Sequence, residues 1–283
     1  MGYRYSAVKK FQLDVLNRNT AHYREYLDLH EYLAEWILWG GEHLPGEVSG
    51  QDAADILSST KTILVRLFND FEAVKILALR GLPDQAYGSL RDSVECMMLC
   101  RLFSVDPESA LRWLSHLKEY SPGTVHARLS ELGVAAPEYA MYGYLSGRAH
   151  ANLAGSLGAV SETDHGDGRV TTHWGVGGFD HPIFIRLMLF QLCLYEVFAM
   201  VDPLTTLFGP HLTQDPAHWK AAIREGIERL RTLVHEVDGE PVVRSRDLKV
   251  ALDKIDSKVD KFKRNLLRAM KAAIGPEFTL DND

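Results

Sequence analysis

Two short polar motifs contain residue types that could carry out acid–base chemistry on an anionic substrate. Arg91 and Glu95 are four residues apart, so a helix places them on one face, and Tyr142, Ser146 and His150 repeat that spacing. An arginine can bind a phosphate, a histidine can move a proton near neutral pH, and a carboxylate can orient the histidine. The motifs therefore predict a catalytic site of Arg91, Glu95 and His150, supported by Tyr142 and Ser146.

A structural interpretation of the same residues stays open, because both motifs sit among apolar neighbours. Ionisable groups on a core-facing stripe are costly unless they are paired, and a paired network can fix the register of two helices. The catalytic interpretation expects Arg91, Glu95 and His150 to converge on a cleft that solvent reaches. The structural interpretation expects them to be buried and satisfied.

The first half of the chain carries two short helical motifs that also occur together in a known protein family. One helix has Gly, then Ala, then Arg-x-x-x-Glu, and a later helix has Leu-Ser-x-x-x-His. In this respect the run from Leu77 to His150 resembles a bacterial family of all-helical proteins of unknown function. The matching residues are Gly81, Ala86, Arg91, Glu95, Leu145, Ser146 and His150.

Such helical bundles in turn resemble the HEPN superfamily, which implies RNA binding or RNA cleavage in a bacterial defence or toxin–antitoxin context. Some members of that superfamily are non-catalytic, so a helical interaction or oligomerisation module is the alternative. The HEPN catalytic signature is Arg, a polar residue, and His after four to six residues. Here Arg91-Asp92 opens correctly, but Cys-Met-Met follows at 96–98, and Arg148 is too close to His150. Two other pairs fit the spacing, namely Arg24 with His30 and Arg229 with His235.

The segment 164–181 holds residue types that ligate zinc or a similar metal. It shows no recognised metal-binding spacing, and turns favour Asp for local backbone reasons alone. The sequence therefore predicts no metal and no cofactor, and a flap over a pocket is another interpretation of this long loop. The residues concerned are Asp164, His165, Asp167, His173, Asp180 and His181.

The C-terminal segment 238–283 reads as a linker followed by an amphipathic helix. Apolar residues there are spaced four and three apart, which is the seam of a coiled coil and predicts packing against one other helix. That helix belongs either to the body of the protein or to a second copy, and we expect a homodimer. Lys261, Arg264 and Arg268 are candidate nucleic-acid contacts, although a solvated helix face is the plainer interpretation. The seam consists of Leu248, Leu252, Ile255, Val259, Phe262 and Leu266.

Composition restricts the class of protein. The 283 residues carry a formal net charge of -7, so the chain as a whole lacks the basic surplus that duplex binders usually have. Cys96, Cys100 and Cys193 are too few for a disulfide framework and predict reduced core thiols in a cytoplasmic protein. The apolar run Ile183–Phe208 contains charged residues and predicts a core helix, with no membrane association.

The elements that must position these residues are helices. We expect an all-α, multi-helix bundle over 1–237 with one small β-hairpin near 158–175, where Asp167-Gly168 lies between β-prone runs. The expected helices cover Phe11–Trp39, Asp52–Arg80, Asp84–Phe103, Glu108–Leu117, Val125–Leu132, Pro137–Leu153, Ile183–Phe208, Asp215–Val237 and Ser245–Ala273.

Overall fold

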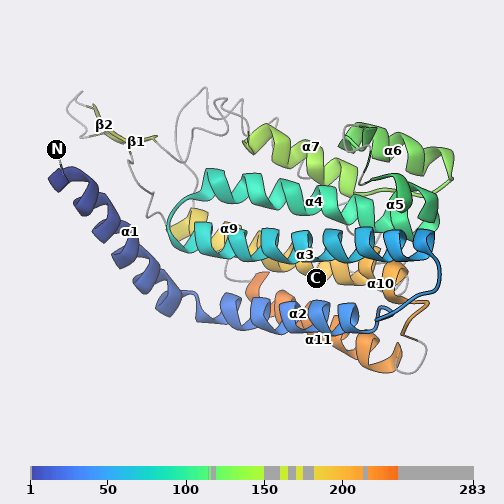
Figure 1. The fold of residues 1–283 in the computed structure, drawn as a ribbon. Coiled ribbons are helices and arrows are strands. Elements are labelled where there is room, and N and C mark those ends of the chain that lie inside the picture. The colour runs from blue at the N-terminus through green and yellow to red at the C-terminus, as the bar shows by residue number, and fades with distance from the viewer. Residues whose placement is uncertain are drawn as a thin grey trace, which may run out of the picture.

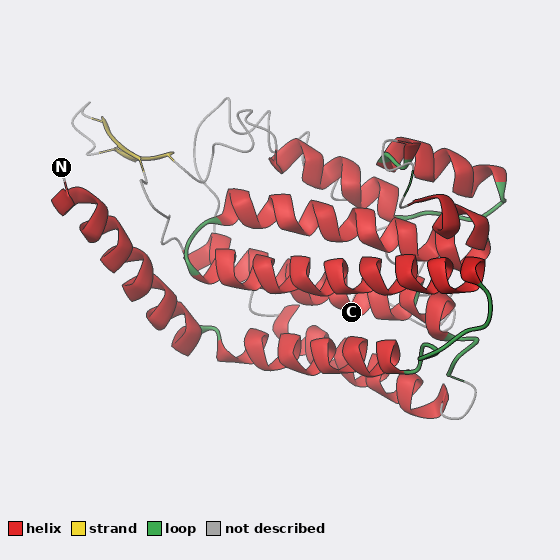
Figure 2. Cartoon of the chain, viewed as in Figure 1, coloured by secondary structure: helices red, strands yellow, loops and turns green. Residues whose placement is uncertain are grey.

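The structure of the protein is a computed structural model. It describes residues 2–113, 115, 119–149, 160–164, 170–174, 182–212 and 216–234. Helices account for most of these residues, and the loops between neighbouring helices are short (Figure 2). The prediction of the all-α class is confirmed.

The helices form a bundle in which α3 and α4 run side by side across the middle (Figure 1). In the same view α7 lies beyond α4, and α2 with α11 lies on the other side of α3. The helices are α1 (Gly2–His22), α2 (Arg24–Glu42), α3 (Gln51–Leu79), α4 (Pro83–Val105), α5 (Pro107–Trp113), α6 (Pro122–Glu131), α7 (Glu138–Ala149), α9 (Pro182–Val201), α10 (Pro203–Phe208) and α11 (Pro216–Val234).

Helix α9 is the centre of the core. It is apolar on every side, which is typical of a helix that is surrounded by others, and it packs against α2, α3, α4, α10 and α11. The stretch Ile185–Phe208 is long and apolar enough to cross a membrane, but 78% of its most apolar window is buried inside the protein. The prediction of a core helix is therefore confirmed for this segment.

Two of the expected helices are broken. The first breaks at Tyr23, where no glycine or proline marks the position, and α1 diverges from the bundle (Figure 1). Asn19 holds the base of α1, because its side-chain amide donates to the carbonyl of Leu79 at the end of α3 (2.9 Å). The apolar run breaks at Asp202, because Pro203 has no N–H to donate and its ring disfavours helical backbone before it.

The expected helix end at Trp39 is too early, because α2 continues through Gly40 and Gly41 to Glu42. Gly40 instead allows a close approach between α2 and the helices α10 and α11. A Cβ atom at Gly40 would lie 2.5 Å from the ring of Phe208 and 3.1 Å from that of Trp219, whereas at Gly41 it would meet nothing within 4 Å.

We therefore expect Gly40→Ala to lower the free energy of unfolding by about 1–3 kcal/mol, because the added methyl group overpacks two buried rings. Gly41→Ala is the matched control, and it should be neutral or slightly stabilising since alanine favours the helix. Denaturant unfolding of both variants beside the wild type checks this. Equal stabilities of the two variants would contradict the close packing at Gly40.

Two short strands lie outside the bundle. Strand β1 (Val160–Asp164) pairs with β2 (Val170–Trp174) in an antiparallel register that sets Glu162 opposite Thr172. The Asp167-Gly168 turn and the C-terminal segment 238–283 lie outside the described residues, so the predicted seam and its homodimer stay predictions. The three cysteines are buried and free, which confirms the prediction of core thiols.

Candidate functional site

Arg91 and Glu95 share one face of α4, as their spacing predicts, and both reach solvent. Their side chains are 27% and 25% exposed, and Arg91 Nε lies 3.8 Å from Glu95 Oε1. A closer contact joins Arg91 to Asp92, with Nη2 donating to Oδ1 at 3.0 Å. Arg91 and Glu95 are thus neither buried in the core nor free of partners.

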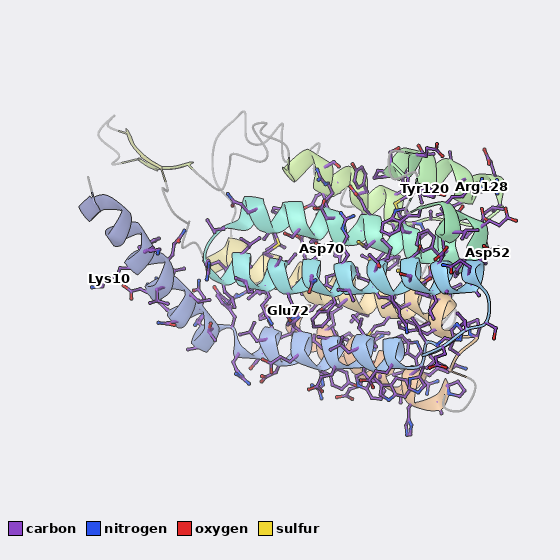
Figure 3. The ribbon with its side chains drawn as sticks, viewed as in Figure 1. Lys10, Asp52, Asp70, Glu72, Tyr120 and Arg128 are labelled. Carbon is purple, nitrogen blue, oxygen red and sulfur yellow. The ribbon has the colours of Figure 1, made fainter. Side chains whose placement is uncertain are left out.

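Two further charged residues extend this face onto α3. Asp70 lies on the side of α3 that faces α4 (Figure 3), where it accepts from the Cys96 thiol at 3.7 Å and lies 3.8 Å from Arg66. We call Arg66, Asp70, Arg91, Asp92 and Glu95 the α3–α4 charged face. Sequence reasoning missed Asp70 and Arg66, although their four-residue spacing on a helix was a usable signal.

Burial and a nearby negative charge make two carboxyl groups of this face, those of Asp70 and Glu95, easier to protonate. Burial raises the pKa of Asp70 to about 6, and the charge of Asp92 adds to the shift although Arg66 opposes it. Burial also raises the pKa of Glu95, again with the help of Asp92 and against Arg91. Carboxyl groups with raised pKa values can exchange protons closer to neutral pH than ordinary ones, and such groups are enriched at functional sites.

Helix α7 packs on α4 and supplies the other predicted residues. Tyr142 on α7 is partly buried and packs against the hydrophobic core. The Ser146 hydroxyl oxygen is buried and makes no hydrogen bond to any described residue. His150 directly follows α7 and lies outside the described residues, so its convergence with Arg91 and Glu95 stays a prediction.

Of the two alternative Arg–His pairs, Arg24 with His30 does not form a site, and Arg229 with His235 stays a prediction. Six residues along a helix is a rotation of about 240°, so Arg24 and His30 face different ways. Arg24 is exposed and pairs with Asp28 at 2.7 Å, whereas His30 is buried. Arg229 lies over the ring of Tyr32, and its predicted partner His235 is outside the described residues.

His30 is the centre of a polar chain that sequence reasoning did not find, and the chain runs from the buried Glu196 to the partly exposed Glu72 and Lys75. Its Nδ1 lies 2.7 Å from Glu196 and its Nε2 lies 2.9 Å from Glu72, which in turn pairs with Lys75 at 2.6 Å. The contact between His30 and the buried Glu196 shares one proton. With both carboxylates ionised that proton lies on the ring, and His30 is then an imidazolium that donates from both nitrogens. The chain links α2, α3 and α9 and leaves no opening to solvent at Glu196, which is 0% exposed.

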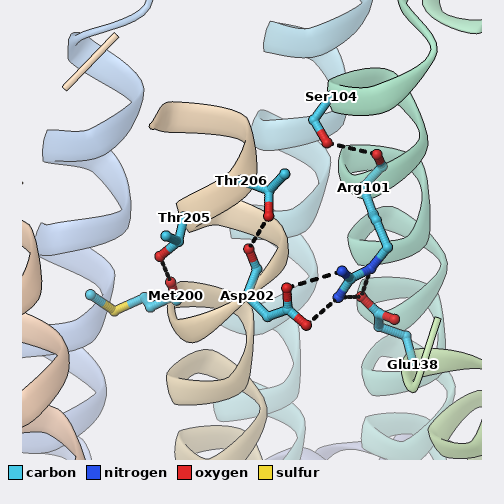
Figure 4. A network of polar contacts seen from close by, with 7 residues as sticks. All are labelled: Arg101, Ser104, Glu138, Met200, Asp202, Thr205 and Thr206. Carbon is cyan, nitrogen blue, oxygen red and sulfur yellow. Dashed lines mark hydrogen bonds and ion pairs between the residues drawn. The ribbon is translucent and has the colours of Figure 1, made fainter. Parts of the chain in front are cut away.

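A second polar network joins α4, α7 and the break between α9 and α10 (Figure 4). Arg101 makes a bidentate contact with Asp202, at 3.0 and 2.6 Å, and its Nε also donates to Glu138 at 2.8 Å. Glu138 is completely buried, and its second oxygen has no hydrogen-bond partner among the described residues. Arg101 and Glu138 are buried, although the side chain of Asp202 is 28% exposed. Because Arg101 and Glu138 are closed off from solvent and tie three helices together, we assign the network a structural role.

Metal chemistry finds no support in the described residues. No group of three or more His, Cys, Asp or Glu side chains there could hold an ion. The segment 164–181 is not covered by that statement, because the side chains of its metal-ligand types lie outside the described residues. Lys261, Arg264 and Arg268 also lie outside the described residues, so their predicted contact with nucleic acid stays a prediction.

No family of known proteins matches the chain, and neither a curated protein sequence nor a solved structure shows significant similarity to it.

Proposed function

We propose that the protein is a HEPN-like helical protein that binds RNA, and cleaves it, where α4 meets α7. The observation that supports this most is the exposure of Arg91 and Glu95, which share a face and reach solvent instead of lying in the core. A purely structural pair at these positions would be buried and satisfied. Because of the resemblance to the HEPN superfamily, we also propose that the protein acts in bacterial defence or in a toxin–antitoxin system.

The proposed roles follow from the chemistry of the groups. Arg91 contacts the phosphate, as guanidinium groups do readily. His150 takes the proton from the 2′-hydroxyl, the 2′ oxygen bonds to phosphorus, and the bond to the 5′ oxygen breaks as that oxygen gains a proton. Glu95 orients His150, and its raised pKa lets it hold or release a proton during this exchange.

Replacing Arg91 with glutamine is expected to weaken binding of single-stranded RNA about equally for all sequences. The slope of affinity against salt should fall by about one, because one phosphate contact is lost. Fluorescence anisotropy of labelled RNA, titrated at several salt concentrations, measures both. Arg24→Gln is the matched control, since Arg24 is also exposed and paired but lies on α2.

Two results would contradict the proposal. One is a wild-type protein that binds no RNA, and the other is an equal loss in the Arg91 and Arg24 variants. For cleavage, His150→Ala should abolish product formation while RNA binding persists.

The alternative, a non-catalytic module that assembles with a second copy, has its own supporting observation. A shallow groove between the loop after α2 and helix α3 exposes mainly apolar surface, with Val48, Leu57 and Val65 next to polar side chains such as Glu47 and Lys61. Apolar surface of this kind often marks a protein contact. Light scattering of the full chain tests this, because the module hypothesis requires a dimer and fails for a monomer.

A further inference from the structure

Helix α1 stands apart from the bundle over most of its length (Figure 1). It meets the bundle near its end, where Val15 and Asn19 are buried and Asn19 donates to the carbonyl of Leu79. Nearer its start, Phe11 is 41% exposed and Leu13 is 56% exposed. Two residues along a helix is a rotation of about 200°, so these side chains point to nearly opposite sides. No described element therefore covers α1 at this point.

An uncovered helix of this kind is marginal in water. Most of the stability of a helix in a protein comes from packing against its neighbours. An apolar side chain that stays in water also forgoes the stabilisation that burial would give. The uncovered part of α1 therefore points to a partner that a single chain does not supply.

The charges of α1 and α2 identify that partner. Without counting histidines, α1 has a net charge of +3 from four basic residues and one acidic residue, namely Arg4, Lys9, Lys10, Arg18 and Asp14. Helix α2 has a net charge of -4 from one basic residue and five acidic residues, namely Arg24, Glu25, Asp28, Glu31, Glu35 and Glu42. These residues of α2 are all exposed, so the negative charge faces solvent.

The outer face of α2 combines this charge with an exposed apolar side chain. Leu38 is 49% exposed and lies between Glu35 and Glu42 along the helix. Arg24 balances part of the negative charge at the other end of α2, where it pairs with Asp28 at 2.7 Å. We give the name acidic stripe to the residues that follow one another at spacings of three and four on this face, namely Asp28, Glu31, Glu35, Leu38 and Glu42.

Helix α1 cannot cover the acidic stripe of its own chain. The two helices are joined end to end at Tyr23, and α1 diverges from the bundle instead of folding back along α2 (Figure 1). A second copy that is related by a two-fold rotation sets the basic α1 of each chain against the acidic α2 of the other. The complementary charges then meet twice, once in each half of the interface.

We propose that the protein forms a two-fold homodimer in which α1 of each chain packs antiparallel along the acidic stripe of its partner. Leu13 contacts the partner's Leu38. Lys10, which is exposed on α1 (Figure 3), precedes Leu13 by three residues and therefore lies beside the partner's Glu42. This interface differs from the predicted coiled-coil seam of the C-terminal segment, and it does not depend on RNA binding.

Leu13→Glu in the full chain tests the interface. Sedimentation equilibrium at several protein concentrations measures the dimer dissociation constant, which should rise about a hundredfold, because a two-fold interface contains the substituted contact twice. The fold of each chain should be kept, since Leu13 is 56% exposed, and circular dichroism checks this. Val65→Glu is the matched control, because Val65 is 60% exposed on α3 and lies outside the interface.

Charge reversal separates the pairing of α1 with the acidic stripe from a general disturbance of α1. Lys10→Glu and Glu42→Lys should each weaken the dimer roughly tenfold, since each places like charges together at two positions. The double variant should recover most of this loss, because it restores opposite charges. Added salt should weaken the wild-type dimer, since ions screen exposed charges.

Hydrogen exchange locates the contact directly. The amide groups in the first half of α1 should exchange slowly in the dimer and much faster after dilution to the monomer, because the uncovered helix opens easily. Equal exchange in the two states would overturn the proposal.

Three outcomes of sedimentation would also overturn it. The first is a wild type that stays monomeric at every concentration. The second is a dimer that Val65→Glu dissociates and Leu13→Glu does not, which would assign the contact to the groove on α3. The third is a dimer that only Ile255→Glu dissociates, which would assign it to the C-terminal seam.

Discussion

Replacing Arg101 with methionine is expected to lower the free energy of unfolding by about 3–5 kcal/mol, because it leaves a buried carboxylate without its counter-ion. Glu138 is fully buried and Arg101 is its ionic partner at 2.6 Å. Burial already raises the pKa of Glu138 against the opposing effect of Arg101. Without the arginine the carboxyl group must take up a proton or stay charged in the core.

Thermal and denaturant unfolding measure this cost. A change of this size corresponds to a drop in Tm of roughly 10 °C for a chain of this length. Arg231→Met is the control, because Arg231 pairs with Glu228 on the surface, where ion pairs contribute little. Adding Glu138→Gln to Arg101→Met should recover part of the loss, and a double variant with the full sum of both losses would contradict the assigned pairing.

The second large effect concerns the proton on His30. His30→Gln should also cost about 3–5 kcal/mol near pH 6, since it breaks an ionic chain whose centre is buried. Burial lowers the pKa of His30, but Glu196 and Glu72 outweigh it and raise the pKa above the ordinary value. Burial raises the pKa of Glu196 as well, against the effect of His30. Both shifts keep the shared proton on the pair.

The sign of the pH dependence follows from these directions. A raised folded-state pKa gives stability that is fully present below the ordinary value of 6.5 and is lost as the pH rises through the folded-state value. We therefore expect the free energy of unfolding of the wild type to fall between pH 6.5 and 8, by at most about 1.4 kcal/mol per pH unit for one proton. Denaturant unfolding in buffers across this range measures it.

His30→Gln should flatten this dependence, because the variant has no proton to lose at that position. The range stops at pH 8, since burial raises the pKa of Cys96, Cys100 and Cys193 and their titration adds a similar slope at higher pH. A wild-type stability that stays constant from pH 6.5 to 8 would show that the pair of His30 and Glu196 does not hold this shared proton.

The sequence predicted most helices because their apolar residues recur at helical spacing over long runs. Helices α3 and α4 begin and end within about two residues of the expected positions, where Pro83 and Gly81 mark the boundary. No glycine or proline marks the break between α1 and α2 at Tyr23. Next to this break Asn19 contacts Leu79 at the end of α3, and the sequence does not show that long-range contact. Gly40 misled the prediction, since a glycine signals either a helix end or a close contact and only the partner helix decides which.

The candidate site was predictable only in part. Spacing placed Arg91 and Glu95 on one face, but their exposure depends on how α7 and α3 cover α4. The two polar networks could not be predicted from the sequence, because their partners are far apart in the chain. His30 is separated from Glu196 by 166 residues and Arg101 from Asp202 by 101. A single sequence shows which residues share a helix face, but it does not show which faces meet.

The central place of α9 has a consequence for the order of folding during synthesis. This helix covers apolar faces of α2, α3 and α4, yet it follows all three in the chain. A ribosome that has made only the first 180 residues has therefore released three helices whose common partner does not exist. His30 at that stage lacks Glu196, so the nascent chain lacks both the central helix of its core and its central ion pair. A chaperone that covers apolar helices would have its longest opportunity there.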